Sequence, residues 1–395
     1  MMSNDRYQGT FFEYFSDLQD NRQEGKVYHR LTDILFIVVS GVLCGYYEWD
    51  DIYTWAKVPA NGEWFEKYIT LMNGIPSLST IKRGFSLIQP QEFLTRFIDW
   101  MSGTITLPNK DIVSVDGKTS RGSKGNDHKV LHIVSALCHS HGLVVGQTKT
   151  DEKSNEITAI PVLLEQLMIK GCIVTMDAMG AQKKILEQIV DKNKADYVVN
   201  LKGNQGTLHK EVQNYFVEAE QAGKRAAIEE RNSEESTFKV LHTVDQGHGR
   251  IEKRTYYYST DLDWMGDAQG DWAKLTGVSD KRKVAFIADP TKTTTETAYY
   301  ISSVDNVTDF ATAARKHWGI ESMHWSLDVT FGDDRNQTRE TAAAQNLAVV
   351  KRMVFNVLKN ETKIQPKTSK PNKRVIAAAD VNYRDHLINM AFHQM

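Results

Sequence analysis

DIVSVDGKTSRGS, residues 111–123, marks the point where the sequence changes from helical to β-rich patterns. Its run Ile112–Val115 is mostly apolar, as in a buried strand, and Asp116 and Gly117 end the run as expected for a turn. The same arrangement returns in CIVTMDAMGAQKK, residues 172–184, where Asp177 ends a second apolar run. The sequence therefore predicts two carboxylates, each at the end of a buried strand.

The segments around these two runs predict a layered α/β core. KVLHIVSALCH (129–139) and GLVVGQTKT (142–150) are β-rich and, with the first run, predict an antiparallel meander. Then come a helix at 156–169, a strand at 172–178, a helix at 181–195 and a strand at 196–204. Three strands, helix, strand, helix, strand predicts a mixed central sheet, and it is the element order of the RNase H-like fold.

Changes of pattern along the chain predict five regions. We expect an N-terminal all-α domain at 1–105 that binds DNA, the first part of an RNase H-like catalytic core at 106–205, a mainly β insertion at 206–284, the second part of the core with a third catalytic acid at 285–360, and a basic linker with a C-terminal helix at 361–395. The fold class predicted from the sequence is thus α/β.

Bulk composition excludes several classes of protein. The 395 residues carry 48 Lys and Arg against 50 Asp and Glu, so no global basic charge indicates nucleic-acid binding. The three cysteines show no CxxC spacing, which disfavours a disulfide framework or zinc ribbon and fits a reducing cytoplasm. No signal-peptide pattern occurs at the N-terminus. The most apolar stretch, Ile34–Gly45, is about half the length that spans a bilayer, so we expect a buried helix and no membrane role.

A third acid stands out in ARKHWGIESMHWSLDV, residues 314–329, which has helical periodicity. His317, Glu321, His324 and Asp328 are spaced 4, 3 and 4, so they share one helix face. We expect Trp318 and Trp325, on an adjacent face, to pack into the core. We favour Glu321 as the third acid, and Asp328, Asp333 and Asp334 compete with it for that position. Zinc is disfavoured, because no HExxH motif and no nearby cysteine accompanies the histidines.

Asp116, Asp177 and Glu321 together suit a site that cuts phosphodiesters with two metal ions. Two divalent cations about 4 Å apart need shared oxygen ligands. The three acids are therefore the predicted catalytic and metal-binding residues, and the predicted cofactor is two Mg²⁺ (or Mn²⁺) ions. For a lone aspartate, a turn or a helix N-cap is the alternative interpretation.

Since the net charge is close to zero, DNA contacts must come from local groups. The predicted DNA-binding residues follow strand ends, lie in a turn that enters a strand, or adjoin the third acid: Lys118, Arg121, Lys202, Asn204, Gln205, His248, Arg250, Arg254, Arg315 and His317. Residues 250, 252 and 254 point to one side of a strand. The alternative to contact with the DNA backbone is therefore an exposed ladder of charges formed by Arg250, Glu252 and Arg254.

An ordered set of motifs resembles one family over nearly the whole length: NGIPS, VDGK, MDAMGAQ, LKGNQ, HGRIEKR and RKHWGIES followed by HWSLDVTFGDD. With these motifs the chain resembles the H-repeat-associated group of bacterial insertion-sequence transposases, which are DDE-type enzymes. The resemblance implies an RNase H-like core, Asp116, Asp177 and Glu321 as the metal-binding triad, and a mainly β insertion after Gln205. It departs from the Tyr-x2-Arg-x3-Glu-x6-Lys signature of related transposases, because Ala314, His317 and Asp328 hold the Tyr, Arg and Lys positions.

The resemblance implies a DNA transposase that cuts the ends of its element and joins the 3′ ends to target DNA. Its partners would be terminal inverted repeats, target DNA and a second copy of the chain in a homodimer. Two other functions fit the same residues: a stand-alone metal-dependent nuclease, and a catalytically silent protein that only binds DNA.

Overall fold

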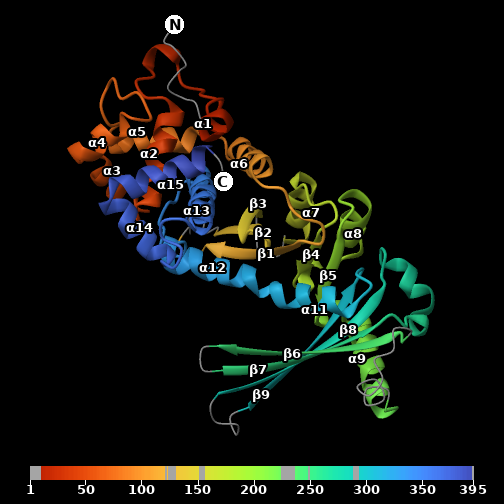
Figure 1. Cartoon of the computed structure of the whole chain (residues 1–395). Coiled ribbons are helices and arrows are strands. Elements are labelled where there is room, and N and C mark those ends of the chain that lie inside the picture. The colour runs from red at the N-terminus through yellow and green to blue at the C-terminus, as the bar shows by residue number, and fades with distance from the viewer. Residues whose placement is uncertain are drawn as a thin grey trace. The chain divides into compact units, whose positions relative to one another are not determined.

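The computed structural model describes residues 10–120, 122, 130–150, 156–223, 236–247, 250–287 and 293–393 (Figure 1). The chain forms two compact units. Unit 1 combines Met1–Thr106, Gly117–Leu167 and Ile320–Met395, and unit 2 combines Leu107–Asp116 and Met168–Gly319. Both units contain helices and strands, which confirms the predicted α/β class.

The helices of unit 1 come from both ends of the chain. They are α1 (Thr10–Phe15), α2 (Leu31–Leu43), α3 (Trp49–Ala56), α4 (Pro59–Phe65), α5 (Leu78–Leu87), α6 (Pro90–Thr104), α7 (Glu156–Gln166), α12 (Trp318–Phe331, from Ile320 onward), α13 (Thr341–Asn360), α14 (Lys370–Ala379) and α15 (Val381–His393). All 13 residues of α2 are buried, as expected for a helix that is apolar on nearly every side. α13 packs against α2, α5, α6, α14 and α15, so the N-terminal and C-terminal helices share one core (Figure 1). Within the described ranges, no helix has the length and apolar character needed to cross a membrane.

Residues 361–395 differ from the predicted basic linker with one helix, because the segment folds into α14 and α15. Glu361 is fully buried and forms an ion pair of 3.0 Å with Lys373. The Arg374 guanidinium is also buried and donates to the backbone oxygen of Val42 at 2.9 and 3.1 Å. The basic residues of this segment thus satisfy buried acceptors, which sequence composition alone does not reveal.

A β-hairpin completes unit 1. β2 (Leu131–Cys138) pairs antiparallel with β3 (Leu143–Thr150), as the meander pattern predicts, and every residue of β2 is buried. α7 packs against both strands. The second part of β1 (Ile112–Ser120), from Gly117 onward, also belongs to this unit.

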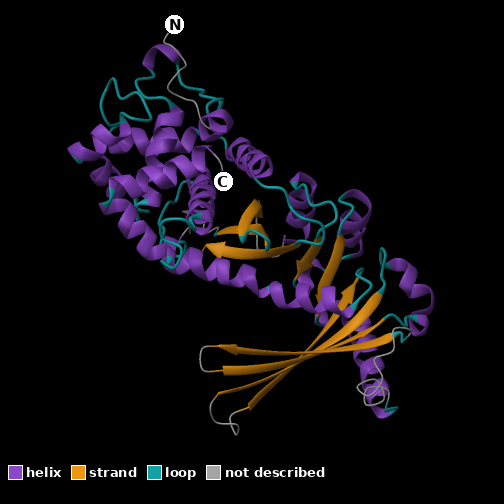
Figure 2. Ribbon diagram, viewed as in Figure 1, coloured by secondary structure: helices purple, strands orange, loops and turns teal. Residues whose placement is uncertain are grey.

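Unit 2 contains the first part of β1 and a large mixed sheet (Figure 2). β4 (Ile173–Met176) pairs parallel with both β1 and β5 (Asp196–Leu201). The sheet continues antiparallel through β9 (Thr293–Ser302), β8 (Gly277–Ile287), β7 (Arg250–Ser259) and β6 (Phe238–Gly247). The helical segments are α8 (Lys183–Glu187), which runs into a π turn at Gln188–Lys192, α9 (Gly206–Gln221) and α11 (Val307–Lys316), with short 3-10 turns at Ala178–Gly180, Gly203–Gln205 and Asp263–Asp271.

The strands predicted as an insertion extend this sheet instead of forming a sheet of their own. β6, β7 and β8 follow β9 in the strand order, and the predicted boundary at 284/285 falls inside β8. The aromatic face of these strands packs on α11, where the ring of Phe310 lies 5.9 Å from that of Tyr256 and 5.3 Å from that of Tyr300. Backbone pairing therefore makes core and insertion one continuous sheet within unit 2.

Candidate active site

β1 continues to Ser120 instead of turning at Asp116 as predicted, but its pairing with β4 stops at Val115, so Asp116 and Asp177 both lie just beyond the paired residues in unit 2. β1 and β4 run parallel with Val115 opposite Met176, so Asp116 and Asp177 are the next residues in register. Asp177 keeps an extended backbone (φ −69°, ψ 171°), so both side chains leave the sheet on the same side. Both aspartates are half-buried. The structure thus brings together two of the three predicted acids.

The Asp177 carboxylate already has partners. Its Oδ1 accepts a hydrogen bond of 2.7 Å from the backbone N–H of Ala178, so the N-cap role and the functional role coexist. The Lys202 ammonium lies 2.8 and 3.1 Å from its two oxygens. Burial raises the pKa of Asp177, but the hydrogen bond from Lys202, the bond from Ala178 and the Lys202 charge lower it overall. Asp177 is therefore ionised at neutral pH.

The loop after β5 supports the Asp177 turn. The side-chain amide of Asn204 donates to the backbone oxygen of Ala178 at 2.6 Å, and that of Gln205 donates to Ala181 at 2.8 Å. These amide groups, predicted to contact DNA, hold the turn in place. A Cβ at Gly180 would lie 2.7 Å from the Met176 side chain, so packing against the protein, and not only room for a ligand, requires glycine there.

Three polar side chains, Ser114, Thr175 and His317, form a hydrogen-bonded series that runs from β1 through β4 to the end of α11. Ser114 Oγ is 2.9 Å from Thr175 Oγ1, and Thr175 Oγ1 is 3.0 Å from Nδ1 of His317, which ends α11. Burial lowers the pKa of His317 to about 4; Asp177 opposes this shift, whereas Lys281 and Lys202 add to it. His317 is consequently neutral at pH 7 and positions the end of α11, whereas the sequence predicts a DNA contact for it.

Glu321 lies in the first turn of α12, is exposed and belongs to unit 1, so its place as the third acid stays a prediction. The competing acids of unit 1 have cationic partners. Asp328 lies 2.5 Å and Asp334 3.4 Å from the Lys118 ammonium. Asp333 is buried, lies 2.9 Å from Lys351 and accepts from Ser120 at 3.1 Å.

The basic residues predicted to grip DNA have different surroundings. Lys118 is only 8% exposed and sits among the three aspartates of unit 1 just described, so it is not an open phosphate contact. Arg254 is 6% exposed and forms ion pairs with Asp245 and Glu252, which fits neither a DNA grip nor an exposed ladder. Arg315 is half-exposed, with Nε 3.2 Å from Asp245. Arg121, His248 and the side chain of Arg250 lie outside the described residues.

Comparison with known proteins decides the family. The family described as Transposase DDE domain matches residues 107–357, and the one described as DDE_Tnp_1-associated matches residues 12–101. "Putative transposase YncI" of Escherichia coli O157:H7 is 37% identical over 93% of this chain and 91% of its own length. "H repeat-associated putative transposase YhhI" of E. coli K12 is 37% identical over 94% of this chain and 95% of its own. This chain belongs to the DDE transposase family.

Comparison with solved structures gives a weak similarity. The piggyBac transposase synaptic complex with hairpin DNA is 9% identical to this chain, covers 96% of it and 77% of its own chain, and superposes with a TM-score of 0.44. The family assignment of this transposase therefore comes from its sequence relatives.

The acids of this transposase fit hard divalent cations. DDE transposase domains use divalent metal ions. Asp116 and Asp177 offer carboxylate oxygens at one sheet edge, which is the ligand chemistry that Mg²⁺ and Mn²⁺ prefer. The three cysteines are buried: Cys44 directly follows α2, Cys138 ends β2, and Cys172 directly precedes β4, at the opposite end of that strand from Asp177.

The sequence analysis missed two further groups of residues, one in each unit. In unit 1, His132 lies 2.7 Å from both Thr119 Oγ1 and Glu156 Oε1, and a Cβ at Gly117 would lie 2.4 Å from Glu156. The glycine after Asp116 thus makes room for Glu156. These residues lie on β1, β2 and α7, so only the folding of unit 1 brings them together.

The second group contains Lys281 and two aromatic rings in unit 2. Lys281 is 4% exposed, and its ammonium lies 5.6 Å from the ring of Tyr300 and 5.9 Å from that of Trp318. Burial lowers its pKa to about 8. Trp318 is 42% and Trp325 65% exposed, so the prediction that these tryptophans pack into the core is wrong. In the sequence, only the alternation of Lys281 and Lys283 along a strand could have indicated this lysine–aromatic group.

Proposed function

We propose that this chain is a DNA transposase that cleaves the ends of its element and joins the 3′ ends to target DNA by two-metal phosphoryl transfer. The observation that carries the proposal is the parallel register of β1 and β4, which sets Asp116 and Asp177 side by side beyond paired strand residues. When bound, two Mg²⁺ (or Mn²⁺) ions would activate the attacking oxygen and stabilise the leaving one.

In this proposal, Asp116 and Asp177 hold the metal ions and Glu321 completes the ligand set. Asp177 is suited to this role because Lys202 and the Ala178 N–H keep it ionised. The hydrogen bonds from Asn204 and Gln205 fix the turn that presents it. Glu321 is kept as the third acid on the strength of its sequence motif; the rival carboxylates Asp328 and Asp333 lie beside Lys118 and Lys351.

Lys202 has a second part in the proposal. Its side chain is 60% exposed and is held to the protein by the Asp177 carboxylate. An exposed ion pair of this kind contributes at most about 1 kcal/mol, so Lys202 can leave when a divalent cation takes its place. The released ammonium would then be close enough to bind a phosphate of the DNA.

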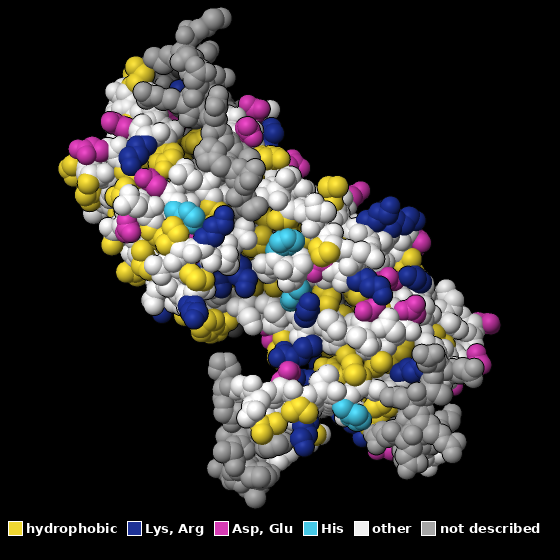
Figure 3. Space-filling model, in the orientation of Figure 1, with side chains coloured by type: hydrophobic (Ala, Val, Ile, Leu, Met, Phe, Trp, Pro, Cys, Tyr) yellow, Lys and Arg dark blue, Asp and Glu magenta, His cyan; other side chains and the backbone are white. Residues whose placement is uncertain are grey.

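The element order supports an RNase H-like core. β1, β2, β3, α7, β4, α8 and β5 follow one another in the predicted order, and β6 to β8 come between β5 and β9. The expected partners are terminal inverted repeats, target DNA and a second copy of the chain. On the face shown in Figure 3, Lys and Arg side chains form several separate groups. With a net charge of −2, DNA contacts must be local.

The first prediction tests the three acids by cleavage of a duplex that carries the element's end sequence. Asp116→Ala, Asp177→Ala and Glu321→Ala should each lower the rate by at least about a thousandfold, and double variants should be little worse, because the ligands act as a unit. Binding to the same duplex in Ca²⁺ should survive in each.

Asp271→Ala is a matched control, because Asp271 is an exposed acid of unit 2 that pairs with Lys183 at 2.7 Å. It should cleave normally. Strand transfer of two paired ends separates a transposase from a stand-alone nuclease. Normal cleavage by Asp116→Ala or Asp177→Ala would reject the proposed site, and loss in Asp334→Ala with normal Glu321→Ala would move the third acid.

A further inference from the structure

A basic cavity lies among the N-terminal helices of unit 1. Its volume is about 700 Å³, within the range of ligand sites. The chain segment before α2, the turn before α5 and α5 itself form its walls, with Arg22, Lys26, His29, Asn73, Ser77 and Arg83 among the lining residues. The cavity falls inside the stretch 12–101 that matches the DDE_Tnp_1-associated family.

The lining carries positive charge and no acid. Among the described residues that line the cavity there is no Asp or Glu. Arg22 is paired with Asp20 at 2.5 Å, so the exposed Lys26 and Arg83 are the main source of positive electrostatic potential in the cavity. Burial, followed by the charge of Arg22, lowers the pKa of His29, so this ring offers hydrogen bonds and not charge at pH 7. The cavity therefore suits an anion with several acceptor oxygens.

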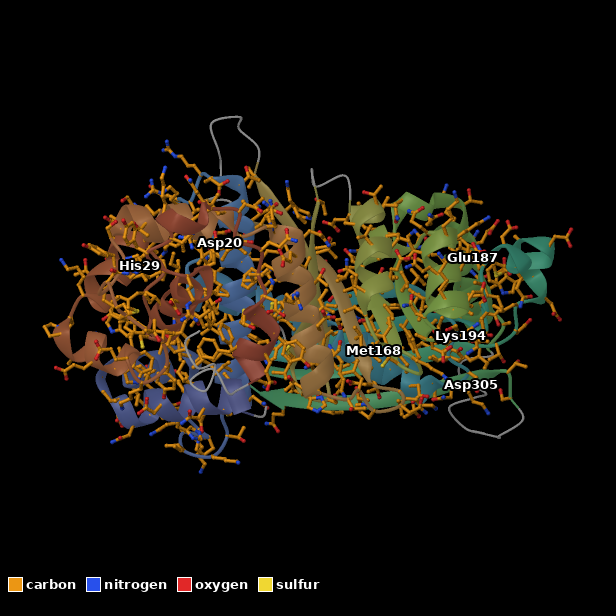
Figure 4. The ribbon with its side chains drawn as sticks, turned by 90° about the horizontal axis from the view of Figure 1, so that it is seen from above. Asp20, His29, Met168, Glu187, Lys194 and Asp305 are labelled. Carbon is orange, nitrogen blue, oxygen red and sulfur yellow. The ribbon has the colours of Figure 1, made fainter. Side chains whose placement is uncertain are left out.

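Hydrogen bonds between the walls hold the cavity in shape. The guanidinium of Arg22 donates to the backbone oxygen of His29 at 2.7 Å, and Asn73 Nδ2 donates to the backbone oxygen of Tyr28 at 2.9 Å. Ser77 accepts from the backbone N–H of Thr80 at 3.2 Å and so fixes the start of α5. Asp20 and His29, which flank Arg22 in the sequence, are labelled on this part of the molecule in Figure 4. The cationic side chains thus project from a built frame.

We propose that this cavity binds phosphate groups of the DNA backbone, with Lys26 and Arg83 as the charged contacts. The inference rests on the proposed function, which supplies the DNA. An Arg fork and a Lys ammonium are the side chains that recognise phosphate oxygens, and such contacts add affinity and register without reading bases. Each phosphate that a cation neutralises releases counterions, so the contact has a measurable salt dependence.

The second prediction concerns Lys26→Ala plus Arg83→Ala in the full-length chain, measured by fluorescence anisotropy on an end-sequence duplex and on an unrelated duplex at several salt concentrations. Affinity should fall about tenfold or more for both duplexes. The slope of log affinity against log salt should flatten by about 2, one unit for each lost phosphate contact. Arg83→Lys should keep most of the slope, because it keeps the charge.

Lys57→Ala plus Lys367→Ala is the matched control, since both lysines are exposed in unit 1 outside the cavity lining. Its DNA affinity and salt slope should stay close to those of the wild type, with any change much smaller than that of the cavity variant. Equal melting temperatures of all variants would exclude unfolding.

The outcomes separate the inference from the proposed function. If the cavity variant keeps wild-type affinity and slope while the wild type binds and cleaves ends, the inference fails and the function stands. If the wild type binds no duplex, both fail. If millimolar inorganic phosphate binds the wild type but not the variant while DNA affinity is equal, the site serves free phosphate and the DNA assignment is overturned.

Discussion

Two lysine–carboxylate groups of this transposase use the same chemistry in opposite surroundings. In unit 2, Lys202 and Asp177 are 60% and 44% exposed. In unit 1, Lys351 and Asp333 are 2% and 4% exposed, and Lys118, which is 8% exposed, joins them. Burial decides what each group can do. An exposed pair is held weakly and can change partners, whereas a buried charge must keep its partner.

The difference also separates the carboxylates that suit catalysis from those that hold the fold. Asp177 keeps an open side at the sheet edge, where a metal ion can compete with Lys202. Asp333 is enclosed by two lysines and Ser120, and its charge compensates theirs. Although all these acids follow similar sequence signals, only those with water-accessible oxygens can exchange a lysine for a divalent cation.

The largest effect should come from the buried group. Asp333→Ala leaves Lys351 buried without its carboxylate and should cost about 3–5 kcal/mol of unfolding free energy. Urea unfolding followed by circular dichroism measures it. Asp334→Ala, at the half-exposed neighbouring position, is the control and should cost less than about 1 kcal/mol. Adding Lys351→Met to Asp333→Ala should recover part of the lost stability. A cost below about 1 kcal/mol for Asp333→Ala would contradict the claim that the buried group is held more strongly than the exposed pair.

A second effect depends on pH, because each group has a partly buried histidine nearby. Burial lowers the pKa of His317, beside Asp177, to about 4, and that of His324, near Lys118, to about 3. Below an unfolded-state pKa of about 6.5 the unfolded chain binds more protons, so stability should fall as pH drops, by up to about 1.4 kcal/mol per pH unit for each histidine.

The decline should continue to about pH 4 for His317 and to about pH 3 for His324. His317→Asn keeps an atom able to bond Thr175 and removes the titration, so its stability should vary less between pH 6.5 and 4. Urea unfolding at several pH values measures this slope. An unchanged slope in both His317→Asn and His324→Asn would show that neither histidine is held neutral.

The smallest effect should come from the exposed pair. Lys202→Met should change stability by at most about 1 kcal/mol. It removes the cation that competes for Asp177, so isothermal titration should show Mn²⁺ binding a few times more tightly, by up to about fivefold for 1 kcal/mol. Lys183→Met is matched in exposure and ion-pair distance, with Asp271 at 2.7 Å, and should leave Mn²⁺ binding unchanged. Weaker Mn²⁺ binding in Lys202→Met would show that Lys202 supports the site instead of occupying it.

Much of the fold followed from local patterns. β4, which ends before Asp177, the β2–β3 hairpin and the buried α2 lie where apolar runs and turn residues predict them, whereas β1 continues past Asp116 to Ser120. The pairing of distant strands could not be predicted from local patterns. Backbone groups form the hydrogen bonds between strands, and the side-chain pattern of one strand does not identify its partner. The sequence therefore missed that β8 and β9 join the predicted insertion to β5.

The site was predictable to a similar degree. The ends of two apolar runs identified Asp116 and Asp177, but exposure was misjudged for Trp318, Trp325, Lys118 and Arg254. Each of these has an ordinary local context, and its burial depends on residues far along the chain. Glu156, placed next to Gly117 by α7, had no local signal at all.

By itself, the sequence determined the order of elements and the two acids that follow apolar runs, because run length, periodicity and turn residues act within a few positions. The tertiary structure alone decided which lysine neutralises which acid. Lys118 and Lys202 follow β-rich runs in similar local settings, yet Lys202 pairs with an acid 25 positions away, and Lys118 with acids such as Asp334, 216 positions away. Burial arises only when distant segments pack, and it makes one lysine a replaceable counter-ion and the other a fixed part of the core.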